Sequence, residues 1–388
     1  MRLSTAMATE PYPFEELDRR KTAAVDAGRE IIDFGIGDPR DDTPAFIREA
    51  LRDAIEPVSS YPRAAGIPML REAISGWISR RYGVPIDPAT QVLPLLGSKE
   101  LVFSLAQTVL EPAEGRDTVI VTAPGYAIPE RGATFAGGRV LRLPLTEEHG
   151  FLPDLGAVDD ETWSRTALLW LNSPNNPTGS VASLDVLRDA AAMCRANDVL
   201  LASDEAYGEI WFDEGPPPGV LQVGDLANVI AINTLSKRSS MTGYRSGFAA
   251  GDPDLIGALK RLRPSVGVTP QEFVQVASVA AWNDESHVQE QRARYAAKRA
   301  LLLDLFARHG IQVAGSVATF YLWVKAPGDR SSLEWALELL ERSGIIVAPG
   351  SFFGPEGEGY VRIALVPTLE ECRRATEILD DLLTEVRA

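Results

Sequence analysis

The stretch that decides the fold runs from Arg165 to Tyr207 and reads RTALLWLNSPNNPTGSVASLDVLRDAAAMCRANDVLLASDEAY. Two apolar runs are separated by a turn rich in Pro and Asn and by an amphipathic segment at residues 183–198. Apolar strands joined through a helix are typical of parallel strands that are buried on both faces of a sheet. The stretch therefore predicts one βαβ unit of an α/β fold.

The same alternation extends outward over residues 90–250. Further strands are expected in QVLPLLG, DTVIVTAPG, GRVLRLPL, NVIAIN and SGFAAG, with helical patterns between several of them. Ligands of such sheets bind at the carboxyl ends of the strands. Polar sequences stand at these ends: GSKE, APGY, SPNNPTG, SDEAY and TLSK. We expect the functional site along this edge of a mainly parallel sheet sandwiched by helices.

After Pro253 the pattern changes to helices interleaved with short strands, which predicts a smaller α+β domain. One long helix is expected from about 270 to 308, and short strands in ATFYLWVKA, GIIVAPG and YVRIALV. The N-terminal segment, with the strand EIIDFGIG, is expected to join this part. The predicted division is a large domain at 46–283 and a small domain formed by 1–45 and 284–388.

Charge and composition exclude several classes of protein. The 388 residues carry a formal net charge of −16, which argues against nucleic acid or an anionic membrane as a partner. No apolar stretch reaches the roughly 18 residues of a membrane-spanning helix, and the N-terminus does not resemble a signal peptide. The two cysteines, Cys194 and Cys372, lie far apart in helical patterns, so a cytoplasmic protein is expected. The three histidines show no metal-ligand spacing, and no metal is expected.

The polar residues at the strand ends point to one ligand. Asp204 ends a buried strand, where a lone carboxylate is costly without a cationic partner. Lys99 stands at a helix N-terminus, which is unfavourable unless an anion binds there, with Ser98 as a donor. Lys237 follows the apolar run NVIAIN, and Arg245 lies between glycines in GYRSG. Pyridoxal 5′-phosphate, which has an aldehyde, a ring nitrogen and a phosphate, accounts for all of these groups.

Roles follow from the chemistry of this cofactor. Lys237 is expected to hold it as an imine and to act as general base, and Asp204 to meet the protonated ring nitrogen. Tyr126 is expected to stack on the ring, although a packed core aromatic is the alternative. Arg238 is expected either to bind phosphate or to form a surface ion pair. The remaining candidates are Asn176 and Tyr207 for the ring oxygen, Ser98, Ser236 and Arg245 for the phosphate, and Gly97 and Lys99 beside them.

The ordered set GSKE, PGY, SPNNPTG, SDEAY, TLSK and GYRSG resembles the fold-type I pyridoxal-phosphate aminotransferases of class I/II, over nearly the whole chain. The tetrad SKRS and the segment WNDESHVQEQRARY are similar to N-succinyldiaminopimelate aminotransferases of lysine biosynthesis. That family commonly has Asn where this chain has Ser240. PYPFEELDRR and DFGIGDP resemble instead the LL-diaminopimelate aminotransferases.

The resemblance implies further residues and a partner. Arg362 would bind the substrate α-carboxylate, helped by the backbone N–H of Gly37 and by Asn176. Tyr61 would reach the phosphate in the neighbouring subunit of a homodimer, and Tyr12 would cover the substrate, although Tyr61 and Arg362 as structural residues remain alternatives. The segment PSVGVTP lacks the Arg or Asn that related enzymes use for the second carboxylate, which leaves Arg63 as the candidate.

The expected activity is amino transfer between glutamate and a small keto or aldehyde acceptor, with N-succinyl-2-amino-6-oxopimelate as the first candidate. LL-diaminopimelate, aspartate and aromatic amino acids are alternative substrates. Two other functions remain open: a pyridoxal-phosphate lyase on the same fold, and the aminotransferase-like half of a transcription regulator. The regulator would need a basic DNA-binding segment, which this acidic sequence lacks.

Overall fold

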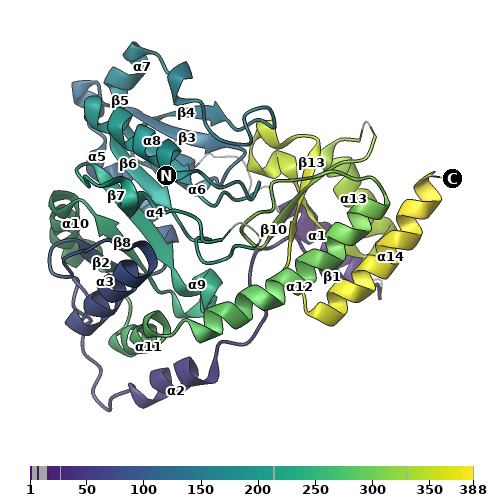
Figure 1. Ribbon diagram of the computed structural model, residues 1–388, viewed down its shortest axis with the longest axis horizontal. Coiled ribbons are helices and arrows are strands. Elements are labelled where there is room, and N and C mark those ends of the chain that lie inside the picture. The colour runs from purple at the N-terminus through teal and green to yellow at the C-terminus, as the bar shows by residue number, and fades with distance from the viewer. Residues whose placement is uncertain (2–6, 8–14, 27, 213–214, 329, 388) are drawn as a thin grey trace.

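The computed structural model describes residues 1, 7, 15–26, 28–212, 215–328 and 330–387. Two lobes lie side by side in this part of the chain, and α12 (Ser286–Arg308) runs from one lobe into the other (Figure 1). The large lobe is built on a large sheet, and the smaller lobe contains the C-terminal helix α14 (Leu369–Arg387).

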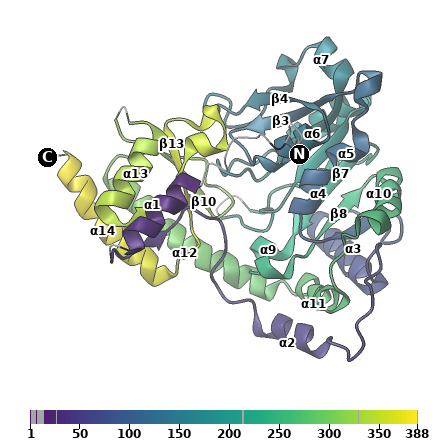
Figure 2. The ribbon, with the colours of Figure 1, turned by 180° about the vertical axis from the view of Figure 1, so that it is seen from behind.

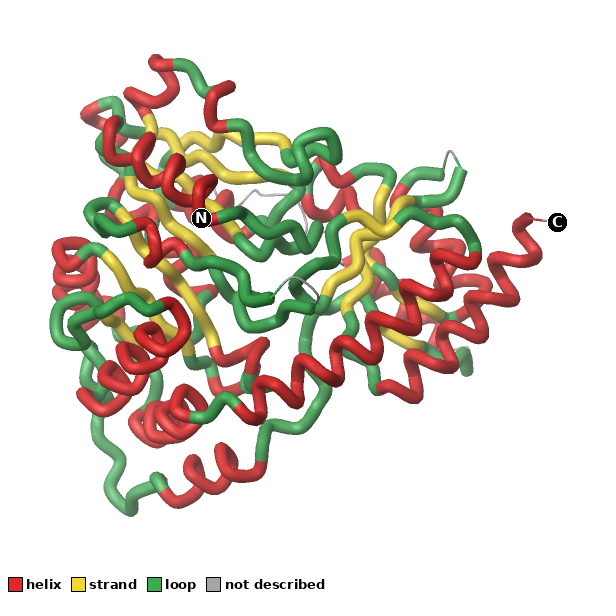
Figure 3. The backbone as a smooth tube through the Cα atoms, in the orientation of Figure 1, coloured by secondary structure: helices red, strands yellow, loops and turns green. Residues whose placement is uncertain are grey.

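The large lobe contains a seven-stranded sheet in the order β2-β8-β7-β6-β5-β3-β4. Strands β3 to β7 are parallel, and β8 is antiparallel to both of its neighbours. Figure 3 shows these strands in yellow, with helices on either side. Their bounds are Val92–Leu95 (β2), Thr118–Ala123 (β3), Arg139–Pro144 (β4), Thr166–Asn172 (β5), Leu200–Asp204 (β6), Val229–Thr234 (β7) and Gly247–Gly251 (β8).

Both faces of the large sheet are buried, because side chains alternate between two apolar clusters. Leu169 and Leu201 belong to the cluster on one face, whereas Leu168 and Leu200 belong to the cluster on the other. Each such buried leucine stabilises the fold by roughly 1.5–3 kcal/mol. The first face packs on α3 (Pro68–Tyr82), α8 (Leu184–Ala196) and α11 (Glu272–Asn283), and the second on α4 (Lys99–Ser104), α5 (Ala106–Val109), α6 (Ile128–Phe135) and α10 (Pro253–Val266). The prediction of a mainly parallel sheet between helices is confirmed.

The smaller lobe combines an antiparallel sheet, β12-β13-β10-β9, with a short parallel pair, β1-β11. Because β1 (Ile32–Asp33) pairs with β11 (Ile345–Ile346), the N-terminal segment lies beside the C-terminal elements, as Figure 2 shows for α1 (Glu15–Asp26). We propose the division into 46–283 and 1–45 plus 284–388 as the two domains. The other elements are α2 (Ala45–Asp53), α7 (Asp160–Arg165), β9 (Val313–Ala314), β10 (Tyr321–Lys325), α13 (Ser332–Ser343), β12 (Ala348–Pro349) and β13 (Tyr360–Ala364).

The long helix predicted from about 270 to 308 is wrong in one respect, since the structure has two helices there. The backbone becomes extended at Asp284, between α11 and α12. The Asp284 carboxylate accepts a hydrogen bond from the backbone N–H of His287 at 3.0 Å. A short acidic side chain of this kind competes with the helical backbone and favours a new helix start.

The cysteines are buried packing residues in helices. Cys194 lies in α8 and Cys372 in α14, and both thiols are free. Burial raises the pKa of each thiol to about 12, so neither is a ready nucleophile. Among the helices of the described residues, none combines the length and the apolarity that crossing a bilayer requires.

Candidate active site

The ends of three neighbouring strands, β5, β6 and β7, form the floor of the candidate site. Asn172 ends β5, and its Nδ2 donates to the backbone oxygen of Asp204 at 2.8 Å, where β6 ends. Thr234 ends β7 and caps the short helix α9 (Leu235–Arg238), which carries Lys237, by accepting from the N–H of Ser236. Adjacent parallel strands thus bring residues from distant parts of the sequence to one edge.

Asp204 is buried at this edge, with 8% of its surface exposed. Burial raises the pKa of its carboxyl to about 6, while the Ala206 backbone N–H and the positive charge of Lys237 act in the opposite direction. The contacts that the protein makes with this carboxylate offset only part of the free-energy cost of burying its negative charge. It can therefore accept a proton or pair with a cationic group that enters the site.

Lys237 points its amine toward the N-terminal segment. Its Nζ donates to the backbone oxygen of Gly37 at 2.6 Å and lies 5.6 Å from the centre of the Phe320 ring. Burial lowers the pKa of this amine to about 8, and the positive charges of Arg362, Arg245 and Lys99 lower it further against the attraction of Asp38. Roughly a tenth of the amine is therefore neutral and nucleophilic near pH 7, far more than for an ordinary lysine.

Arg362 on β13 brings a cation from the smaller lobe. Its side chain is buried, and Nη1 donates to Oδ1 of Asn176 at 2.9 Å while Nη2 donates to the backbone oxygen of Gly35 at 2.6 Å. The guanidinium lies 4.2 Å from the centre of the Tyr321 ring. Its Nε has no hydrogen-bond partner among the described residues. Arg362 thus faces no carboxylate of the protein at these atoms and is suited to bind one from a ligand.

Arg245 is held in a left-handed backbone conformation, with φ 55°, and its Nη1 donates to the backbone oxygen of Thr242 at 2.8 Å. Its guanidinium occupies the space next to Gly97, where a Cβ would come within 2.3 Å of Nη2. The φ of 70° at position 97 favours glycine, and the missing Cβ leaves the space that the guanidinium occupies. Ser98 lies directly after Gly97 and does not cap α4, so its hydroxyl is available beside the arginine.

The side chains of Ser236 and Thr234 are hydrogen-bonded to each other, with Oγ1 of Thr234 2.9 Å from Oγ of Ser236. Gly247 lies where these segments meet, since a Cβ there would come within 3.3 Å of the Thr234 Cα and 3.4 Å of the backbone nitrogen of Ser98. Ser98, Ser236 and Arg245 thus come from three segments that meet at this end of the sheet.

Tyr321 belongs to the site but was not predicted from the sequence. Its Oη lies 3.1 Å from Oη of Tyr207, and both phenols are buried. The same oxygen is packed against Gly37, where a Cβ would come within 2.0 Å. Tyr321 stands in FYLWV, which reads as an ordinary alternating strand. Only its inward position on β10, next to Arg362 on β13, reveals the contact.

The other expected residues lie in varied places. Tyr126 is half-buried and packs on the apolar cluster under the sheet, with Lys99 Nζ 5.9 Å from its ring centre. Tyr61 and Arg63 are exposed in the loop between α2 and α3. Tyr12 lies outside the described residues. The two interpretations of Tyr126 therefore remain open.

Arg238 forms an ion pair, as one of the two predictions for it states, but its guanidinium is buried. Its side chain is 1% exposed, and Nη2 donates to Oε1 of Glu285 at 2.9 Å. The guanidinium carbon lies 4.6 Å from the ring centre of Trp282 and 5.5 Å from that of Trp77. The ion pair is therefore not on the surface at the arginine, because aromatic rings cover the guanidinium.

The chain belongs to the class I and II aminotransferases. The model of that family, described as aminotransferase class I and II, matches residues 29–379. An LL-diaminopimelate aminotransferase of Nitratidesulfovibrio vulgaris is 38% identical over 370 residues, which cover 94% of this chain and 95% of the relative.

Solved structures agree with this assignment. An aminotransferase from Neisseria meningitidis superposes with a TM-score of 0.92 at 35% identity and covers 98% of this chain and 100% of its own. A single mutant of aspartate aminotransferase from Thermus thermophilus gives a TM-score of 0.90 at 29% identity, with 98% and 100% covered. The fold is that of a fold-type I aminotransferase, and the family depends on pyridoxal phosphate.

The donor set of the site fits this cofactor. Lys237 offers an amine with a lowered pKa, and Asp204 offers a buried carboxylate with a raised pKa. Arg245 and Ser98 offer a cation and a hydroxyl beside the glycine that makes room for them. These groups correspond to the aldehyde, the ring nitrogen and the phosphate of the cofactor.

Proposed function

We propose that this chain transfers amino groups between glutamate and an amino dicarboxylate of the diaminopimelate series, in the cytoplasm, with Lys237 as the cofactor-binding lysine. The observation that carries this proposal is the meeting of Lys237, Asp204 and Arg362 at one edge of the sheet. Lys237 points toward Gly37, and Arg362 is held by Asn176 and Gly35 with its Nε unpartnered in the described part of the chain.

Pyridoxal phosphate supplies, when bound, a ring that withdraws electrons from the carbon next to the amino nitrogen. In the proposal Asp204 pairs with the protonated ring nitrogen. The raised pKa of this carboxyl shows that the protein does not fully stabilise its negative charge, so a cationic group of the ligand can do so. Asn176 and Tyr207 bind the ring oxygen, and Tyr126 covers the ring. Gly97, Ser98, Lys99, Ser236 and Arg245 surround the phosphate.

Lys237 would also be the group that moves the proton of the substrate Cα. A pKa of about 8 places the amine close to the working pH of a cytoplasmic enzyme, where a general base is most effective. The substrate carboxylate binds Arg362, with the backbone N–H of Gly37 as a further donor. This binding holds the Cα–H within reach of the lysine.

The proposal includes a homodimer in which Tyr61 serves the neighbouring site. Tyr61 is 100% exposed, and the same part of the chain exposes Ile55, Val58 and Met69. Apolar side chains gathered in this way mark a surface that a partner covers. A second copy of this chain would bury them and bring the Tyr61 hydroxyl to the phosphate.

Among substrates, the free diaminopimelate is favoured over the succinylated compound. The relatives at 35–38% identity are LL-diaminopimelate aminotransferases. The tetrad SKRS had favoured the succinylated substrate, but Arg238 of this tetrad is covered by Trp77 and Trp282. Its side chain therefore gives no physical reason to expect a succinyl group.

A substrate panel tests the choice. LL-diaminopimelate, N-succinyl-LL-diaminopimelate, aspartate and phenylalanine are each supplied with 2-oxoglutarate, and glutamate formation is measured. We expect the highest kcat/KM with LL-diaminopimelate. Higher kcat/KM with the succinylated compound restores the first candidate from the sequence, and turnover of aspartate or phenylalanine alone overturns the diaminopimelate proposal. Ammonia and pyruvate released from cystathionine, without glutamate formation from any of the four, would establish a lyase.

A further inference from the structure

The segment that follows Lys237 is held by the junction between α11 and α12, which we define as residues 282–287. Arg238 is the first contact. Its guanidinium is covered by Trp282 and Trp77 and pairs with Glu285 at 2.9 Å. Since Glu285 is 39% exposed and Arg238 only 1%, the pair connects a buried arginine to the outer side of the junction.

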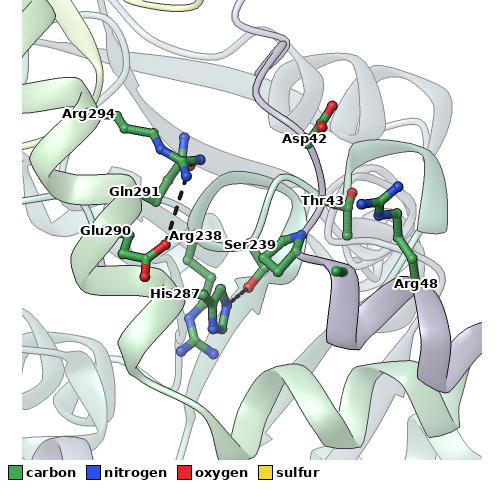
Figure 4. A pocket seen from close by; sticks show the side chains of 11 residues that line it. Asp42, Thr43, Arg48, Arg238, Ser239, His287, Glu290, Gln291 and Arg294 are labelled. Atoms are coloured by element: carbon green, nitrogen blue, oxygen red, sulfur yellow. Dashed lines mark hydrogen bonds and ion pairs between the residues drawn. The ribbon is translucent and has the colours of Figure 1, made fainter.

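Ser239 makes the second contact with the junction. Its Oγ lies 2.9 Å from Nε2 of His287 (Figure 4). Nδ1 of the same ring lies 2.6 Å from the Asp284 carboxylate. Burial lowers the pKa of His287, so the ring is neutral at physiological pH and has one donor and one acceptor. The carboxylate can only accept, so Nδ1–H donates to it and Nε2 accepts from the Ser239 hydroxyl.

A cavity of about 280 Å³ lies beside these contacts, between residues 42–48 and the start of α12. Figure 4 shows Ser239 and His287 at its wall. Ser239 lines this cavity on one side but is only 1% exposed, and its backbone N–H donates to the Leu235 oxygen at 3.1 Å. The hydrogen bond between its side chain and His287 adds a contact with the junction to these local ones.

The helix that carries Lys237 cannot hold the lysine by itself. Helix α9 contains only the four residues Leu235–Arg238, and a single turn of helix is unstable without tertiary contacts. Thr234 fixes its N-terminal end by capping. At its C-terminal end, Arg238 and the following residue Ser239 contact Glu285 and His287 of the junction.

We propose that Arg238 and Ser239 are positioning residues, which fix the C-terminal end of α9 to the junction and thereby direct the Lys237 amine toward the substrate carbon. Neither residue is proposed to touch cofactor or substrate. This inference rests on the role of Lys237 proposed above. If that role is wrong, Lys237→Ala will retain cofactor-dependent turnover, whereas a failure of the present inference leaves Lys237→Ala inactive.

The test compares four variants of the holoenzyme: Ser239→Ala, Glu285→Gln, Arg238→Met and Arg238→Lys. Because a displacement of about 1 Å at a catalytic group can lower the rate a hundredfold, we expect kcat to fall about tenfold in the first two and about a hundredfold in Arg238→Met, with KM changed less than about twofold. Arg238→Lys keeps the charge and should recover part of the loss. Hydrogen exchange of residues 234–244, measured by mass spectrometry, should become faster in step with the loss of kcat.

Asp304→Asn is the matched control for Glu285→Gln. Asp304 lies on the same helix, pairs with Arg308 at 3.2 Å, and loses the same charge in its variant. It should leave kcat, the exchange of residues 234–244 and the pH midpoint of the cofactor absorbance unchanged.

The proposal is overturned if Ser239→Ala and Glu285→Gln behave as the control does in kcat and in local exchange. It is also overturned if they lower only the melting temperature, with normal kcat for the folded fraction. Should Arg238→Met fail to fold, Ser239→Ala and Glu285→Gln decide the outcome. Ser239→Ala removes one hydrogen bond, Glu285→Gln removes the negative charge of one ion pair, and both leave the packing of Arg238 on Trp77 and Trp282 intact.

Discussion

Asp204 and Tyr61 are both proposed to serve the same cofactor, yet their surroundings are opposite. Asp204 ends a central strand and is 8% exposed, whereas Tyr61 is 100% exposed in the loop between α2 and α3 at the outer side of the large lobe (Figures 1 and 2). The strand-end part of the site is complete within one chain. In the proposed homodimer the loop part acts only when a second copy binds, so the two parts should respond differently to substitution and to dilution.

The largest effect is expected from Lys237→Ala in the strand-end part. Without the amine neither the covalent attachment nor the proton transfer is available, so kcat should fall by about a thousandfold or more. The measurement is the rate at which glutamate changes the cofactor absorbance in a single turnover. Lys325→Ala, on β10 and paired with Glu147, is the control. A wild-type rate in Lys237→Ala would contradict the assignment.

Asp204→Asn should lower kcat by about a hundredfold, and a loss smaller than about tenfold would count against its pairing with the ring nitrogen.

The same variant should make the cofactor-free protein more stable. Burial raises the pKa of this carboxyl to about 6, so its ionised form is less favourable in the folded chain than in the unfolded one. The carboxylate therefore destabilises the fold above pH 6, and this penalty disappears as the pH falls below the ordinary pKa of about 4.

Urea unfolding of the cofactor-free protein checks the sign of that effect. At pH 8 the free energy of unfolding of Asp204→Asn should exceed that of the wild type by about 2–3 kcal/mol, since each pKa unit corresponds to about 1.4 kcal/mol. At pH 4 the difference should nearly vanish. A variant that is less stable at pH 8 would show that the carboxylate is already compensated in the folded chain.

Arg362→Lys should reduce kcat/KM about a hundredfold, mainly through KM, because lysine cannot reproduce a bidentate contact with a carboxylate. Steady-state kinetics with the amino donor measure it. Arg374→Lys, on α14 at an exposed ion pair with Glu30, should change neither constant. An equal loss for a donor amine that has no carboxylate would point to a structural role for Arg362 instead.

Tyr61→Phe should have the smallest effect of the series, about fivefold weaker cofactor binding, which is the loss of one hydrogen bond. Equilibrium titration of the cofactor measures it, and Tyr360→Phe in the smaller lobe is the control. Mixed dimers sharpen the test. A Tyr61→Phe chain paired with a Lys237→Ala chain contains one intact site and should bind cofactor there as the wild type does. If the affinity of that site is reduced, Tyr61 acts within its own chain.

The strand-end residues could be predicted because chain order determines where they lie. A buried parallel strand places its last residue at one edge of the sheet, so Asp204, Asn176 and Lys237 follow from periodicity and turns. The contacts of Arg238 could not be predicted in this way, because Trp77 comes from α3 and Glu285 from the junction before α12, both distant in sequence. Tyr321 was missed because an alternating strand does not reveal which neighbouring side chain it meets. The break at Asp284 was missed although the polar run NDESH at 283–287 interrupts the apolar pattern and contains residue types that favour helix starts.

The contact between Gly97 and the Arg245 guanidinium also limits how this enzyme can be altered. A side chain at position 97 would have to push aside the end of the flexible Arg245 side chain, and it would also have to adopt a φ of 70°, which only glycine adopts readily. A substitution at position 245 can relieve the first of these constraints but not the second. Libraries for redesigning the cofactor pocket of this scaffold should therefore keep Gly97 fixed.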